Sequence, residues 1–423
     1  MNVHTSPRTP AETALVDAFS ERVGDLPGNA DVAVARDTAL EALKIQGLPS
    51  RRIESWHYTD LRTLLRSVAP FDAAAGSQPI APLVTGSTVA AVSNGTTISA
   101  GQVDGVTFEK LGDKLANGTF APSLATRSTD DVIGQINAAY VTDGWSVDIA
   151  EGTELDAPLE LQNLQKSGQG HVRFPVRVGK QAKATIVERQ YGGEGEAFSS
   201  SISELTVADG AEIIWIILRQ HSDTSSVQLG QFNAVLGKDA KLTLFIVNAG
   251  GKLVRQEVHL QARGEGSDFQ LRGINLLGGQ THTDITMTVG HLVENTTSTE
   301  IVRNVVTGRA RGAFQGMIRV AQIAQKTDAR MACNSLLLSD DAEFDAKPEL
   351  EIFADDVACG HGATVTEIDQ DHLFYLMARG IPEKTARGLL VKAFVAEIIE
   401  ELEDEPLVEV LEGLLEEWLS AHG

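Results

Sequence analysis

Apolar and polar residues alternate along the middle of the chain. From about residue 158 to residue 319, short alternating segments are separated by Gly, Asp and Asn, and no stretch has a helical period. Segments 242–247 and 258–262 are typical, because a strand that is buried on one face carries apolar side chains at every second position. The pattern predicts that the central region is mainly β.

A turn followed by a strand recurs within this region. The copies start at residues 178, 207, 236 and 262, so they lie 29, 29 and 26 residues apart. A near-constant period indicates a solenoid, because each unit buries its apolar face only against the next one. With strands as the units, the predicted fold is a β-helix. A β-sandwich also has regularly spaced strands, and it stays open as the alternative.

Helical patterns precede the β region. Thr9 and Glu12 form a capping box around Pro10, which predicts a helix that starts there. A second helix is predicted over about residues 32–46, and a short third one follows Asp60. Residues 71–82, which are rich in Ala, Gly, Ser and Pro, are interpreted as a linker.

Helical patterns return after Pro348. A helix is predicted over 371–379 with Gly380 at its end, and two longer helices are predicted to open at Pro382 and Pro406. From residue 393 to the end there are ten acidic residues and no Lys or Arg. This acidic stretch is either a solvated helix face or a docking surface for a basic partner.

We therefore divide the chain into three parts. Residues 1–85 form an N-terminal helical region with the linker, 86–350 a β-helix core with its clearest repeats in 158–319, and 351–423 an interface motif and a C-terminal helical domain. A solenoid has unpaired strand edges at both ends, and the helical regions are in the right place to cover them. The predicted fold class is mainly β with flanking helices, a solenoid capped by helical domains.

Charge and cysteine content limit the classes of function. Thirty-five Lys and Arg against 58 Asp and Glu give a net charge of −23, which argues against nucleic acid or an anionic membrane as a partner. No apolar run exceeds six residues and no secretory signal opens the chain, so we expect neither a membrane span nor export. Two cysteines fit the reducing cytoplasm, and they cannot supply the four thiolates of an ordinary iron–sulfur cluster.

The best candidate for chemistry lies just after the predicted β region. Cys359 and His361 are two residues apart between glycines, so they can present a thiolate and an imidazole together. Asp355 and Asp356 could orient the imidazole. A Cys-x-His pair also occurs by chance in many proteins. Cys333, in a predicted strand, is interpreted as a small buried apolar residue.

Several familiar catalytic motifs are missing. There is no Gly-x-x-x-x-Gly-Lys-Ser/Thr loop for ATP, no His-Glu-x-x-His, no Gly-x-Ser-x-Gly and no Cys-x-x-Cys. We therefore expect that this chain does not bind ATP through a P-loop. A polysaccharide-cleaving enzyme is the alternative for a β-helix, although such enzymes are generally exported.

Two segments resemble one known family. Residues 353–364 and 371–381, which include Cys359 and His361, resemble the C-terminal signature of the SufB/SufD family, in particular its SufD branch. Residues 48–61, with Trp56, are similar to that family's N-terminal motif. His57 departs from it, since Lys or Arg is more usual there.

The resemblance implies a fold, partners and a site. It implies a right-handed parallel β-helix between helical domains, a heterodimer with a SufB-like paralogue, and a SufC-like ATPase docked on the C-terminal helices. We take the acidic C-terminal helices as the expected dock for this ATPase. It implies a transient iron–sulfur cluster at the heterodimer interface with His361 as an essential group and Cys359 as its neighbour, and reduced flavin in the assembled complex. An open strand edge would also let the isolated chain form a homodimer.

We interpret the chain as a non-enzymatic scaffold subunit that assembles clusters at a shared interface for transfer to apo-proteins. The alternative within the same family is a self-contained, SufB-like cluster carrier.

Overall fold

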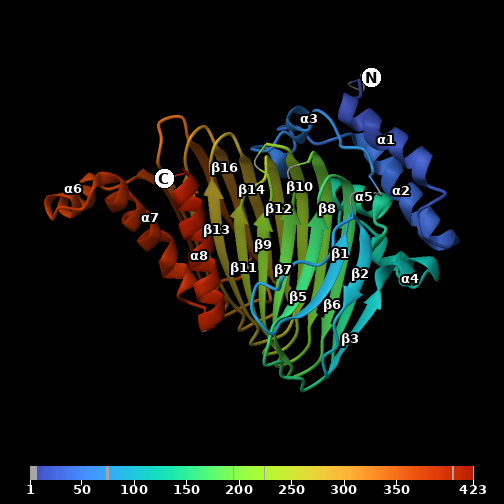
Figure 1. The fold of residues 1–423 in the computed structure, drawn as a ribbon. Coiled ribbons are helices and arrows are strands. Elements are labelled where there is room, and N and C mark those ends of the chain that lie inside the picture. Colours follow the sequence, from blue (N-terminus) through green and yellow to red (C-terminus); the bar gives the residue numbers. More distant parts are fainter. Residues whose placement is uncertain (1–6, 73–75, 194, 223, 403, 423) are drawn as a thin grey trace.

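The computed structural model describes residues 7–72, 76–193, 195–222, 224–402 and 404–422. The chain folds as a parallel β-solenoid with helices at both ends (Figure 1). Residues 73–75 of the expected linker lie outside the described residues, and the rest of 71–82 is neither helix nor strand.

Two sheets form the solenoid, and from β4 onward successive strands alternate between them. Sheet A contains β1 (Thr88–Ser93), β2 (Thr96–Ala100), β5 (Leu159–Gln165), β7 (Lys183–Gly192), β9 (Glu212–Gln220), β11 (Lys241–Ala249), β13 (Asp268–Leu277), β15 (Thr297–Val306), β17 (Asp328–Leu337) and β19 (Ala358–Glu367). Sheet B contains β3 (Val106–Lys110), β4 (Asp143–Ile149), β6 (Gly168–Val178), β8 (Ala197–Val207), β10 (Ser226–Leu236), β12 (Leu253–Ala262), β14 (His282–His291), β16 (Arg311–Val320) and β18 (Glu343–Ile352).

Parallel pairing confirms the β-helix and excludes the sandwich. The named strands pair in parallel with the strand one turn away, except for the antiparallel pairs β1–β2 and β3–β4 at the N-terminal end. The predicted register of the first three repeats is confirmed, since Glu212 pairs with both Lys183 and Lys241. The fourth repeat differs by one residue. Lys241 pairs with Asp268 instead of Ser267, because the turn before β13 holds one extra residue and so keeps Phe269 facing inward.

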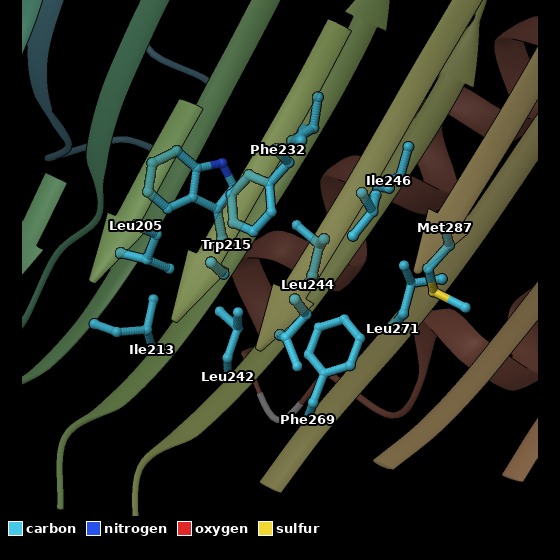
Figure 2. Packing of buried hydrophobic residues seen from close by; sticks show 14 of the residues in the cluster. Leu205, Ile213, Trp215, Phe232, Leu242, Leu244, Ile246, Phe269, Leu271 and Met287 are labelled. Carbon is cyan, nitrogen blue, oxygen red and sulfur yellow. The ribbon is translucent and has the colours of Figure 1, made fainter. Parts of the chain in front are cut away.

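Apolar side chains from the two sheets fill the interior. Figure 2 shows Trp215 of β9, Leu244 of β11 and Leu271 of β13 on neighbouring strands of sheet A. Trp215 packs edge-on against Phe232 of β10, with ring centroids 5.1 Å apart. Because parallel strands pair in register, residues at equivalent positions of each turn form continuous rows along the solenoid.

One interior row is polar and is held by side-chain hydrogen bonds. Asn248 donates to Asn275 Oδ1 at 2.7 Å, Asn275 donates to Asn304 Oδ1 at 2.7 Å, and Asn304 donates to Ser335 Oγ at 3.0 Å. Each amide therefore satisfies the amide of the neighbouring turn, which removes most of the cost of burying it.

The helices lie on the outer faces of the sheets. N-terminal helices pack with Phe198, Ile202 and Leu229 on sheet B, and C-terminal helices pack with Ile216 and Phe245 on sheet A. Their bounds are α1 (Pro10–Arg22), α2 (Ala30–Gln46), η1 (Glu54–Trp56), α3 (Leu61–Leu64), α4 (Leu111–Ala116), η3 (Ala121–Leu124), α5 (Val132–Tyr140), α6 (Gln370–Ala378), α7 (Glu383–Ile399) and α8 (Glu405–His422).

The predicted flanking helices are confirmed, including the capping box of α1, in which Thr9 and Glu12 exchange hydrogen bonds. α5 was not predicted, because all its residues are buried and its sequence has no polar face. No helix in the described part of the chain is long and apolar enough to cross a membrane.

Two expectations about the C-terminal end of the core need correction. The strands continue to Glu367, past the expected boundary at residue 350. The helices also do not cap this end, because α7 and α8 lie on the face of sheet A while β18 and β19 are terminal strands with one paired neighbour each in their sheets. The solenoid is therefore open at its C-terminal end.

The N-terminal motif ties the helices to sheet B. Trp56 is buried under the guanidinium of Arg255, whose Cζ lies 4.3 Å from the ring centroid. The backbone oxygen of Ser55 accepts hydrogen bonds from Arg255 at 2.6 Å and from Gln315 at 3.3 Å. The motif thus serves as a strap across β12 and β16.

Truncating a core aromatic residue should destabilise the solenoid strongly. Phe269 is fully buried, so Phe269→Ala should lower the free energy of unfolding by about 3–5 kcal/mol, measured by urea denaturation. Phe374→Ala is the matched control at a side chain that is 72% exposed, and it should change the value by less than about 0.5 kcal/mol. Similar losses for both variants would contradict this assignment of the core.

Candidate site at the open end

Cys359 and His361 lie on β19, the last strand of sheet A, and not after the β region as the sequence suggested. β19 pairs only with β17, where Cys359 lies opposite Ala329 and His361 opposite Met331. Ala329 and Met331 belong to the interior core. Since paired residues of parallel strands face the same way, Cys359 and His361 lie on the inward face of the sheet at its open end.

The surroundings of this pair are accessible from outside. An open depression of about 460 Å³ is lined by Arg330, Met331, Ala358, Cys359, Gly360 and His361. Gly360 and Gly362 lie on either side of His361, and an added Cβ would meet nothing within 4 Å at either position. A second polypeptide can therefore approach the backbone of β19 closely.

The environment of Cys359 favours the protonated thiol. Partial burial raises the pKa of Cys359, and the negative charges of Asp328 and Glu300 add to the increase. A metal ion bound by the Cys359 sulfur must therefore displace a proton.

The role expected for Asp355 and Asp356 stays a prediction, and the contacts of Asp356 lie elsewhere. The carboxylate of Asp356 pairs with Lys326, and its backbone N–H donates to Gln325 Oε1 at 2.9 Å. Within the described ranges no hydrogen bond joins either aspartate to His361. Both residues lie in the loop before β19, and the contacts of Asp356 order this turn.

Cys333 is a buried core residue, as predicted. It is fully inaccessible on β17, and its sulfur accepts a hydrogen bond from Asn304 at 3.4 Å. Burial raises the pKa of this thiol to about 12. In the part of the chain that the structure describes, no group of three or more His, Cys, Asp or Glu residues could hold a metal ion. This chain offers one accessible thiol and one imidazole at the open end.

Sequence reasoning missed Glu300, which lies on β15, two strands behind Cys359 and His361. Glu300 pairs with Met331, which pairs with His361, so the three residues form one inward row. Its side chain is fully buried and neither carboxylate oxygen has a hydrogen-bond partner. Burial raises the pKa of Glu300 to about 8. Extending the repeat alignment by one more turn would have revealed an acid in an apolar row.

The comparison with known families agrees with this architecture. The family described as "SUF system FeS cluster assembly, SufBD core domain" matches residues 162–394. The chain belongs to the SufBD family.

Individual SufBD relatives match most of the chain. The iron-sulfur cluster assembly protein SufD of Escherichia coli (strain K12) is 29% identical over 382 residues, which cover 87% of this chain and 88% of the relative. The SufBD family protein slr0076 of Synechocystis sp. is 30% identical over 305 residues, covering 69% of this chain and 66% of its own length. Protein ABCI7, chloroplastic, of Arabidopsis thaliana is 28% identical over 405 residues, covering 86% and 81%. The predicted SufB/SufD resemblance is confirmed, and with it a function in iron–sulfur cluster assembly at the level of the family.

Stability should respond to pH through Glu300. The folded chain holds the Glu300 proton more tightly than the unfolded chain does, so the wild type loses stability as pH rises from about 4.5 to about 8. Asp268, Arg272, His291 and Cys359 are its titratable neighbours, and Glu300→Gln leaves them in place. Urea denaturation at pH 5 and pH 8.5 should show Glu300→Gln gaining about 3–5 kcal/mol relative to wild type between the two values. A difference that does not change with pH would contradict the unpaired, buried carboxyl.

Proposed function

We propose that this chain is a non-enzymatic scaffold subunit that assembles iron–sulfur clusters together with a SufB-like paralogue, at a site shared across the open end of the solenoid. One observation carries the proposal. The last strand, β19, has an unpaired edge and is exposed along most of its length, and it presents Cys359 and His361 on its inward face.

The number of ligands supports a shared site. An ordinary cluster takes four cysteine thiolates, whereas Cys359 is the one thiol that reaches this surface because Cys333 is buried in the core. A paralogue that contributes further sulfur ligands would complete the site. Iron and sulfide are cargo here, and an incomplete sphere with an imidazole ligand should release a cluster more easily than four thiolates would.

The strand edges support a partner of the same fold. β18 and β19 each present a row of backbone N–H and C=O groups on the edge away from the solenoid. A paralogue with the same open end can satisfy these groups by continuing both sheets, which is a known mode of strand addition. Pairing with a second copy of this chain would use the same edge in the isolated protein.

For the SufC-like ATPase we propose α6 and the start of α7 as the docking surface, which we call the α6 surface. Phe374, Tyr375, Met377 and Leu389 are 41–72% exposed on it. The acidic stretch after residue 393 is less suited, because Glu397, Glu401, Glu412 and Glu416 already pair with Arg272, Arg303 and Lys392 of this chain. Reduced flavin in the complex is an expectation of the resemblance alone, and we assign no described residue to it.

Replacing His361 tests the shared site. His361→Ala removes the imidazole without disturbing the core, because the side chain is exposed at the open end. We expect loss of cluster maturation in cells that depend on the Suf system, with the complex still formed, as measured by activity of a cluster-dependent reporter enzyme and by co-purification.

His57→Ala is the matched control, since His57 is exposed on the N-terminal motif, outside β19 and the α6 surface, and its ring lies 3.2 Å from the backbone oxygen of Arg51. It should leave maturation unchanged. Normal maturation with His361→Ala would refute the role of His361.

Polar substitutions on the α6 surface test the ATPase dock. The double variant Phe374→Ser, Tyr375→Ser should release the ATPase in a pull-down, because it removes exposed apolar area without touching the core. Glu409→Gln and Glu417→Gln on α8 are the controls and should retain it. Truncation at Pro382 is a poorer test, because α7 and α8 cover Ile216 and Phe245 on sheet A. Retention by the double variant would place the dock elsewhere.

A further inference from the structure

Glu300 interrupts an apolar row. This row runs across neighbouring strands of sheet A, and each member pairs with the next: Leu159, Ile186, Trp215, Leu244, Leu271, Glu300, Met331 and His361. Figure 2 shows the apolar members Trp215, Leu244 and Leu271 inside the core. The five strands that precede β15 on this row, from β5 to β13, thus each place a large apolar side chain where β15 places a carboxyl.

No hydrogen bond of normal geometry reaches the Glu300 carboxyl, and the Ser298 hydroxyl and the Arg272 guanidinium lower its pKa less than burial raises it. Its nearest charged groups are Arg272 and Asp268 on β13, and Arg272 is committed to Glu401 on the outer face. His291 is the titratable group on β14 nearby, and it is occupied by Thr296 and Ser298 at 2.8 and 3.1 Å. On the strands toward the open end, Met331 is uncharged, and Cys359 and His361 are the titratable groups of the candidate site.

A second interior glutamate shows what a structural carboxylate looks like in this solenoid. Glu188 on β7 is also almost fully buried, and it accepts hydrogen bonds from Gln190 at 2.6 Å, Ser203 at 2.7 Å and Trp215 at 3.1 Å. Glu300 accepts none. A buried carboxyl without partners costs stability, so its presence at this place suggests a function.

The position of Glu300 indicates that function. One strand lies between it and His361, so two strand spacings of about 4.8 Å place it about 10 Å behind the site. It already influences the thiol, since its charge contributes to the raised pKa of Cys359. At this distance a carboxylate in protein surroundings attracts a divalent cation appreciably.

We propose that Glu300 is a further functional residue of the open-end site: it ionises when His361 and Cys359 bind a divalent iron ion, and its carboxylate stabilises that ion from inside the solenoid. The inference deepens the proposed function and rests on it. No electrons move in this step. The Cys359 S–H and the Glu300 O–H each release a proton to solvent. The metal–sulfur bond takes the place of the Cys359 S–H bond.

The size of the effect follows from two opposing terms. At about 10 Å and an effective dielectric constant near 20, a carboxylate should strengthen binding of a divalent ion by roughly two powers of ten. At pH 7 the cost of ionising an acid whose pKa is about 8 reduces this gain in affinity by about one power of ten. The net gain is about tenfold at pH 7 and should grow when the pH rises above 8.

Calorimetric titration with Co²⁺, an air-stable substitute for Fe²⁺, tests the inference on this chain in complex with its SufB-like paralogue, which completes the site. Repeating it in two buffers of different ionisation enthalpy counts the protons released. At pH 7 the complex with Glu300→Gln should release one proton fewer per Co²⁺ than the wild-type complex and bind about tenfold more weakly. Glu188→Gln is the matched control and should keep the wild-type affinity and proton count. At pH 9 the proton from Glu300 should disappear from the count while the difference in affinity widens.

Stability separates this role from a structural one. Glu300→Leu restores the apolar row and should raise the urea midpoint of the chain while weakening Co²⁺ binding like Glu300→Gln. Equal affinity and proton count in wild type and Glu300→Gln, a lowered midpoint in Glu300→Leu, or a wild type that binds no Co²⁺ would each overturn the inference. The proposed function would survive any of these results, because His361→Ala in cells tests it separately.

Discussion

In-register pairing of parallel strands is the constraint on which the rest of this structure depends. Each strand of sheet A pairs with the strand one turn away, so equivalent positions align in rows along the whole solenoid. A row of apolar residues makes a continuous core, and a row of amides such as Asn248, Asn275 and Asn304 makes a hydrogen-bonded ladder. Each residue can therefore be compared with the residues at the same position one turn before and one turn after it. At the position of Glu300 these residues are the apolar Leu271 and Met331.

The same constraint explains why the functional surface lies where the solenoid stops. Every strand in the interior obtains its backbone partners and its apolar cover from the next turn, whereas β18 and β19 have no next turn. The exposed edge, the inward-facing Cys359 and His361, and the bare backbone at Gly360 and Gly362 all follow from that interruption. Helices α7 and α8 leave this end open because they are held on the face of sheet A by apolar packing and by ion pairs such as Arg303–Glu397.

Most of the fold could be predicted, and the failures have physical causes. The strand repeats, the capping box at Thr9 and the glycine ends of α2 and α6 are local signals, so they were read correctly. α5 was missed because a helix buried on all sides lacks an amphipathic period. β19 was missed because a terminal strand that is exposed along its length does not alternate as buried strands do. The role given to Asp355 and Asp356 came from closeness in sequence alone, and the turn directs the Asp356 carboxylate to Lys326.

The sequence by itself determined the period of the solenoid, the helical flanks, the scarcity of thiols and the Cys359–His361 pair, since these depend on residue types and on spacing along the chain. Only the tertiary structure decided which end of the solenoid is open, that Cys359 reaches the surface at that end, and that Glu300 lies in line with His361. These facts depend on pairing between residues about 30 positions apart, and a single chain read from end to end does not reveal which strands lack a neighbour.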